Sequence, residues 1–144
     1  MDGFEKSSVL IVDDNPESVM MLAFILKSDY VIFKASNGPD AIESAIKNNP
    51  DIILLDVLMP KMDGYEVLGR LKEAEETKDI PVIFVTGLTE ADDEAKGLEM
   101  GASDYITKPF SATIVKLRVE KQLKLGRLEK KYNEALAIMA SQQL

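Results

Sequence analysis

Short apolar runs alternate with amphipathic segments along most of the chain. The runs cover residues 8–12, 30–35, 51–55, 81–86 and 104–107. Apolar runs of four to six residues bounded by Pro, Gly, Asp or Asn are typical of buried strands. The segments between them carry apolar residues three and four positions apart, which predicts helices. The pattern therefore predicts five strands, each followed by a helix.

Capping residues and glycines suggest where these helices begin and end. Thr89 is expected to cap the fourth helix, with Asp92 three residues later in a weak capping box. Gly101 is expected to end that helix, and Ser111 to cap the fifth. The expected helices cover 16–28, follow Asn37 and Gly38, begin near Gly64, run from Thr89 to Met100, and continue from Ser111.

Strands separated by helix-length segments need crossover connections, and these connections produce a parallel sheet. Five strand–helix units predict a doubly wound α/β domain, with a five-stranded parallel sheet and helices on both of its faces. In this architecture the functional crevice lies beyond the carboxyl ends of the strands. The residues at those ends are therefore the first candidates for chemistry.

Those ends carry acids, a hydroxyl and a lysine. Asp13 and Asp14 follow the first strand, Asp56 the third, Thr86 ends the fourth, and Lys108 follows the fifth. Three carboxylates held together repel one another unless a cation joins them. A carboxylate such as Asp56 can attack a phosphoryl group, and a metal ion, a lysine and a hydroxyl suit the charge that develops. The pattern predicts a metal and phosphoryl site.

Composition narrows the chemistry of that site. The chain has no cysteine and no histidine. Disulfides, thiolate or imidazole metal ligands and a phosphohistidine within this chain are therefore excluded. Any metal must be held by oxygen, which favours Mg²⁺ and leaves Mn²⁺ as an alternative. Neither a signal peptide nor a membrane-spanning stretch is recognisable, so the cytoplasm is the expected location and no membrane partner is expected.

Charge is distributed unevenly along the chain. Residues 1–110 hold 10 Lys and Arg against 22 Asp and Glu, whereas residues 111–144 hold 7 against 3. An acidic domain followed by a mixed-charge helix accounts for this asymmetry, and direct nucleic-acid binding is not expected.

The C-terminal segment has a helical pattern of its own. Apolar residues recur at intervals of three and four over about two heptads, as in a coiled-coil seam. A self-associating helix and a frayed helical linker both remain open as interpretations. The seam residues are Leu125, Leu128, Tyr132, Ala135 and Met139.

Four motifs in order resemble the receiver domain of a two-component response regulator, over about Ser8 to Leu123. They are Val12-Asp13-Asp14-Asn15, the run from Leu55 to Gly64, Val85-Thr86-Gly87 and the run from Asp104 to Phe110. The resemblance implies a flavodoxin-like strand order of 2-1-3-4-5. It also implies a receiver domain at 7–124 and a helical extension at 125–144, read as a coiled-coil linker to an output domain outside this sequence.

The resemblance also implies roles for individual residues. Asp56 accepts a phosphoryl group from a sensor histidine kinase or a phosphotransfer protein. Asp13, Asp14, Asp56 and the backbone carbonyl of Leu58 arrange Mg²⁺. Thr86 and Lys108 contact the phosphoryl group, Tyr105 turns inward when Thr86 moves, and the Lys108–Pro109 bond is cis. The expected output is a homodimer formed through the fourth helix, fifth strand, fifth helix and the C-terminal extension.

Two alternatives stay open beside this switch. One is a degenerate receiver that binds partners without phosphorylation. The other is a Mg²⁺-dependent aspartyl-phosphate phosphatase, which is disfavoured because Leu58 stands where such enzymes carry a second aspartate. The switch interpretation makes the chain a signalling protein that assists only its own phosphorylation and dephosphorylation.

Overall fold

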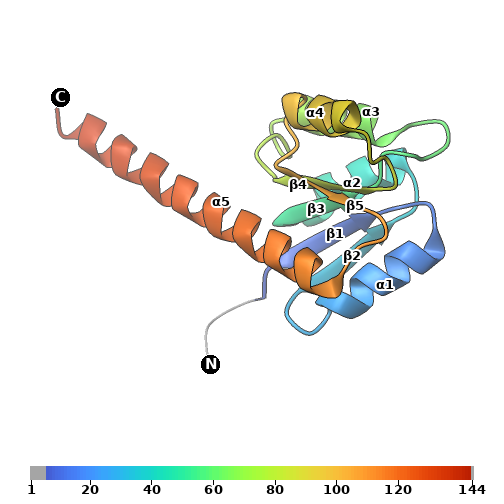
Figure 1. Cartoon of the computed structure of the whole chain (residues 1–144). Helices are drawn as coiled ribbons and strands as arrows, with labels where there is room; N and C mark the ends of the chain where they lie inside the picture. Colours follow the sequence, from blue (N-terminus) through green and yellow to red (C-terminus); the bar gives the residue numbers. More distant parts are fainter. Residues whose placement is uncertain (1–5, 144) are drawn as a thin grey trace.

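A computed structural model of the chain describes residues 6–143 (Figure 1). The strands form one parallel sheet in the order β2-β1-β3-β4-β5, as the resemblance implies. The strands are β1 (Ser8–Val12), β2 (Val31–Ala35), β3 (Ile52–Leu55), β4 (Val82–Thr86) and β5 (Asp104–Thr107). The helices are α1 (Pro16–Leu26), α2 (Gly38–Asn48), α3 (Gly64–Glu73), α4 (Ala91–Glu99) and α5 (Ala112–Ser141).

The central strands are apolar on both faces because both faces are covered. Successive side chains of a strand point to opposite faces. In β1, Val9 and Ile11 join one core cluster while Leu10 and Val12 join the other. β3 and β4 divide their residues between the two clusters in the same way. This double burial explains why these strands appear in the sequence as continuous apolar runs.

The helices form a layer on each face of the sheet. α1 and α5 cover one face, and α2, α3 and α4 cover the other (Figure 1). The apolar residues at helical spacing in α1 and α3 include Leu22, Leu26, Val67 and Leu71, all of which are buried. Helical spacing in the sequence was therefore sufficient to identify the faces of these helices.

Element ends differ from the prediction by one or two residues. α1 ends at Leu26, and β2, β3 and β4 each begin one residue later than expected. The capping role predicted for Thr89 is wrong, because the N-cap of α4 is Glu90 and no side-chain hydrogen bond caps that end within residues 6–143. Three acidic residues in the first turn of α4 instead place negative charge near its amino terminus, which the helix dipole favours.

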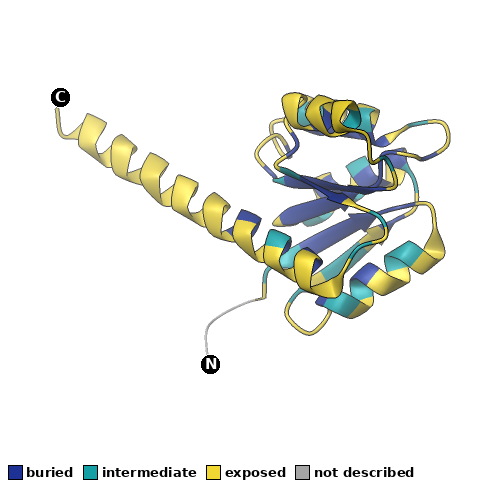
Figure 2. Cartoon of the chain, in the orientation of Figure 1, coloured by how far each residue is buried: buried dark blue, intermediate teal, exposed yellow. Residues whose placement is uncertain are grey.

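α5 is a single helix of 30 residues with two different environments. Its first turns bury Val115, Val119 and Leu123 against the sheet. From Lys124 onward every described residue is exposed, and this part projects away from the sheet (Figure 2). Within residues 6–143, none of the helices has the length and hydropathy needed to span a bilayer.

Gly64 brings the start of α3 directly onto the backbone that follows β3. A Cβ at position 64 would collide with the carbonyl oxygen of Asp56 and lie 2.7 Å from the Cα of Val57. The Gly64 N–H also donates to the Val57 carbonyl at 2.8 Å. Only glycine permits this approach, which fixes the loop that carries Asp56 against α3.

We predict that Gly64→Ala destabilises the fold by about 1–3 kcal/mol because the added methyl group must displace backbone. Gly69→Ala in the same helix is the matched control, since a Cβ there meets nothing within 4 Å. Gly69→Ala should be neutral or raise stability by up to ~1 kcal/mol. Urea unfolding of both variants measures the difference, and equal effects would contradict the close packing at Gly64.

Candidate functional site

The carboxyl edge of the sheet gathers all the side chains that the sequence placed at strand ends. β1 and β3 are neighbours, so Asp13, Asp14 and Asp56 emerge side by side. β4 pairs with β3 and ends at Thr86, and Lys108 follows β5 one strand further along. The parallel order therefore converts distant sequence positions into one cluster.

The three aspartates form the acidic part of this cluster. Asp13 and Asp56 are buried, whereas Asp14 is exposed. One carboxylate oxygen from each lies within 4.8 Å of the others. Asp13 Oδ1 also accepts a hydrogen bond from the Asn15 N–H at 2.9 Å. The turn after β1 thus holds Asp13 in place at the start of α1.

Lys108 supplies the positive charge nearest to the buried acids. Its ammonium nitrogen lies 2.7 Å from Asp13 Oδ2 and 3.5 Å from Asp56 Oδ2. The backbone N–H of Lys108 donates to the backbone carbonyl of Thr86 at 2.8 Å, which holds Lys108 at the end of β4. The Lys108–Pro109 bond is cis, as the resemblance implies. One lysine therefore bridges two carboxylates that would otherwise repel each other.

Burial and the neighbouring Asp13 charge raise the pKa of Asp56 above its ordinary value. Lys108 and hydrogen bonds from the Leu58 N–H and the Thr86 side chain oppose that rise without cancelling it. The Leu58 N–H lies 3.3 Å from Asp56 Oδ1. The pocket thus disfavours the ionised form of Asp56. A bound cation, or a group added to the carboxylate, would relieve this electrostatic cost.

Thr86 connects the cluster to Tyr105. Thr86 is fully buried, and its hydroxyl accepts a hydrogen bond from the Leu88 N–H at 3.4 Å. The carbonyl of Leu88 accepts one from the Tyr105 hydroxyl at 2.9 Å. Burial is the main cause that raises the pKa of Tyr105 to about 12, so this hydroxyl stays protonated and donates at neutral pH. Tyr105 points inward in this structure.

An aromatic row lies behind this connection, and the sequence did not reveal it. Phe84 packs edge-on between Tyr65 and Tyr105, at centroid distances of 5.5 and 6.2 Å. A Cβ at Gly97 would lie 2.9 Å from the Phe84 ring, so glycine lets α4 rest on this row. The Lys96 ammonium sits 4.1 Å from the Tyr65 ring centroid. The row links α3, β4, β5 and α4.

Two other residues of the loop after β3 have roles of different kinds. Asp63 caps α3 by accepting a hydrogen bond from the Glu66 N–H at 2.9 Å. The side chain of Leu58 is exposed beside the cluster. The Leu88 carbonyl was missed altogether, because a backbone carbonyl leaves no signal in the side-chain sequence.

The donor set fits a hard divalent cation. Three carboxylates, two of them buried, converge where Lys108 offsets part of their charge. Mg²⁺ and Mn²⁺ prefer such oxygen ligands and keep several waters, which the exposed side at Asp14 leaves room for. When bound, such a cation would neutralise charge on a transferring phosphoryl group.

We predict that Asp56→Asn stabilises the protein in metal-free buffer near neutral pH. The folded-state pKa of Asp56 is raised, so ionisation costs stability as pH rises from the ordinary carboxyl range through that raised value. Asparagine removes this cost, and a rise in Tm of roughly 3 °C is expected. Thermal unfolding with a chelator measures the effect across a pH series.

The gain should vanish at low pH, where Asp56 is protonated in both the folded and the unfolded states. Asp29→Asn, at an exposed loop position, is the control and should not stabilise. A pH-independent change in Tm would contradict the charge repulsion inferred here.

Comparison with known proteins gives one consistent family. The family model for the response regulator receiver domain matches residues 9–120. A probable cyclic di-GMP phosphodiesterase of Vibrio cholerae is 40% identical over 127 residues, which are 88% of this chain and 29% of that protein. Response regulator PleD of Caulobacter vibrioides is 43% identical over 112 residues, 77% of this chain and 25% of that protein. The chain thus spans less than a third of either relative.

Solved structures agree with this assignment. A putative response regulator from Chloroflexus aurantiacus superposes with a TM-score of 0.80 at 33% identity, covering 83% of this chain and 99% of that one. The signal receiver domain of a putative Luxo repressor protein from Vibrio parahaemolyticus gives a TM-score of 0.82 at 29% identity, covering 89% and 98%. Receiver domains are signalling switches that work with histidine kinases or phosphotransfer proteins. The chain belongs to the response regulator receiver domain family of two-component systems.

Proposed function

We propose that this chain is a phosphorylation switch whose acceptor is Asp56. A histidine kinase or phosphotransfer protein supplies the phosphoryl group, which suits a chain without histidine. Asp13, Asp14, Asp56 and the carbonyl of Leu58 hold Mg²⁺, and Thr86 and Lys108 bind the phosphoryl oxygens. The observation that carries the proposal is the Lys108 ammonium placed between Asp13 and Asp56 at 2.7 and 3.5 Å.

The transfer step moves one phosphoryl group between two proteins. A carboxylate oxygen of Asp56 forms a bond to phosphorus as the bond from phosphorus to the donor imidazole nitrogen breaks. The electron pair of the broken bond stays on the imidazole, which takes up a proton from water. Lys108 and the metal site offset the charge on the phosphoryl oxygens, and the product is an acyl phosphate on Asp56.

The switch itself is proposed to run through Thr86 and Tyr105. A phosphoryl group on Asp56 offers the Thr86 hydroxyl a new acceptor for its proton, and a turn toward that acceptor would move the Thr86 oxygen away from the Leu88 N–H that now donates to it. Because the Leu88 carbonyl holds the Tyr105 hydroxyl, a movement of that loop changes the population of inward Tyr105. The surface formed by α4, β5 and α5 then differs between the two states.

The organisation we propose is a receiver at residues 7–124 and a helical extension at 125–144 that leads to an output module. Two features support it. Burial in α5 stops at Leu123, and the chain covers only a minor part of its relatives. The relative with a phosphodiesterase name shows that a receiver of this kind can be one part of an effector protein.

A homodimer through α4, β5, α5 and the extension is the proposed output. Exposed apolar side chains lie on both helices, including Leu98, Ile114 and Leu117. Further along α5 the seam residues are exposed as well. Apolar side chains grouped in this way favour a partner surface.

We predict that acetyl phosphate with Mg²⁺, or a cognate kinase, adds the mass of one HPO₃ to the intact protein. Asp56→Asn should abolish the gain, and Lys108→Ala should slow it by at least about tenfold because the phosphoryl charge loses its nearest cation. Intact-protein mass spectrometry over a time course measures both.

Chelating the divalent metal should also suppress the reaction, and Asp29→Asn should leave it unchanged. An equal mass gain in Asp56→Asn would contradict the assignment of the acceptor. No gain with any donor, together with no binding of beryllofluoride, would favour the degenerate receiver. Turnover of a small phosphate ester would favour the phosphatase.

We also predict that beryllofluoride with Mg²⁺, which mimics the phosphoryl group, shifts the monomer–dimer equilibrium by about tenfold or more, within the usual range of allosteric coupling. Light scattering over a dilution series measures this. Tyr105→Phe, which removes the bond to Leu88, should reduce the shift. A monomer in both states would contradict the proposed dimer while leaving the phosphorylation proposal intact.

A further inference from the structure

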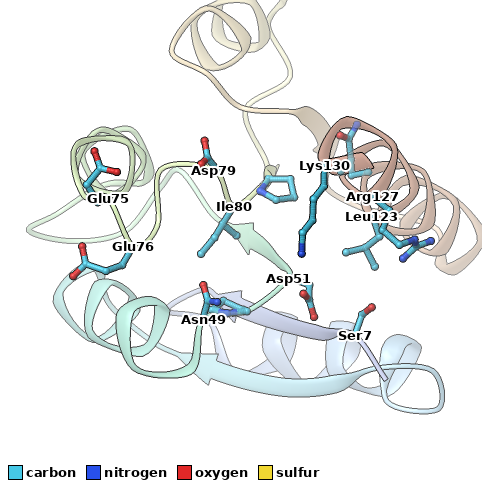
Figure 3. Close-up of a pocket in the computed structure, with 14 residues that line it drawn as sticks. Ser7, Asn49, Asp51, Glu75, Glu76, Asp79, Ile80, Leu123, Arg127 and Lys130 are labelled. Atoms are coloured by element: carbon cyan, nitrogen blue, oxygen red, sulfur yellow. The ribbon is translucent and has the colours of Figure 1, made fainter. Parts of the chain in front are cut away.

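The extended part of α5 has two faces of different character. Arg127 and Lys130 line a cavity of about 400 Å³ between α5 and the amino-terminal edge of the sheet. The opposite wall is acidic, and the Lys130 ammonium points into the cavity toward Asp51 (Figure 3). The acidic residues lining the cavity are Asp51, Glu75, Glu76 and Asp79.

This charge arrangement gives the two sides of the extended helix different environments. With Leu125 taken as position a of a heptad, Arg127 and Lys130 occupy positions c and f. Those positions lie opposite the a and d positions of the helix. Attraction between the basic side and the acidic wall therefore favours an orientation in which the seam faces away from the domain.

The seam is exposed over its whole length. Leu125, Leu128, Tyr132 and Met139 are 47%, 54%, 64% and 57% exposed, and Ala135 completes the a/d pattern. A short helix is usually marginal in water because its first turn is costly to form. Here that cost is already met, since the seam continues a helix anchored by Val119 and Leu123.

The flanking charges distinguish one partner orientation from the other. Lys124 and Lys131 occupy g positions, and Glu129 occupies an e position. In a parallel coiled coil each g residue faces the e residue of the next heptad in the other chain, which pairs Lys124 with Glu129 of a second copy. An antiparallel pair sets g against g and e against e. Between residues 124 and 138 that arrangement forms no acid–base pair.

We infer that residues 125–139 pair with the same residues of a second copy as a parallel, in-register coiled coil, with Lys124 of each chain facing Glu129 of the other. The inference deepens the proposed self-association and rests on it, but not on phosphorylation. Because the seam covers only about two heptads, the pairing is weak alone, and the receiver surfaces tune its population.

The chain has no cysteine, so single-cysteine variants report the geometry directly. Ala135→Cys places a thiol at position d of the seam. Ala137→Cys places a thiol at position f, on the side of the helix opposite the seam. It is a matched control in residue type and exposure. Under mild oxidation of the full chain, Ala135→Cys should form disulfide-linked dimers at least about tenfold faster than Ala137→Cys.

A charge swap tests the cross-chain pair. Lys124→Glu should weaken the dimer about fivefold in sedimentation equilibrium, because two repulsive pairs replace two attractive ones. Lys124→Glu combined with Glu129→Lys should restore it, since both charges are exposed and only their sign is exchanged.

Three results would overturn the inference. Equal cross-linking of the two cysteine variants would show that the seam is not the interface. Faster coupling of mixed Tyr132→Cys and Ala135→Cys chains than of either alone would show an antiparallel pair. Either result leaves the proposed self-association in place, whereas a monomer at every concentration contradicts both.

Discussion

The structure depends on how three carboxylates are tolerated at one edge of a sheet. Asp13 and Asp56 are buried side by side, and burial together with this proximity raises the pKa of Asp56. Lys108 lies between them and offsets part of the repulsion. Because Lys108 does not offset all of the repulsion, an added cation would relieve the rest. The proposed metal and phosphoryl chemistry builds on this.

A series of hydrogen bonds and packing contacts runs from the carboxyl edge of the sheet to α4 and β5. Thr86 accepts from the Leu88 N–H, and the Leu88 carbonyl holds the Tyr105 hydroxyl. Behind them, Phe84 packs against Tyr105, and Gly97 lets α4 rest directly on its ring. A close-packed interior of this kind favours discrete alternatives over gradual deformation. The proposed switch would use these contacts to connect a change at Asp56 with the surface of α4, β5 and α5.

α5 begins at that surface and continues beyond the packed part of the receiver. Its first turns belong to the core, and its later turns carry the exposed seam that we infer to pair with a second copy. The residues that pack α5 against the sheet and the residues of the seam lie on opposite sides of the helix. The inferred dimerisation at the seam and the packing on the receiver therefore use different residues of α5.

Sequence alone determined the fold class, the strand order through the family motifs, and the acids, hydroxyl and lysine that meet at the carboxyl edge of the sheet. It could do so because parallel strands buried on both faces must be apolar throughout, so a polar residue at a strand end is conspicuous. Element ends were predicted only to within one or two residues, and the cap expected at Thr89 was wrong. Tertiary structure decided that the Leu88 carbonyl holds Tyr105, that Gly64 lies on the Asp56 backbone, and that burial in α5 stops at Leu123. These features depend on backbone atoms and on distances between separate elements, and neither is encoded in the type of any single side chain.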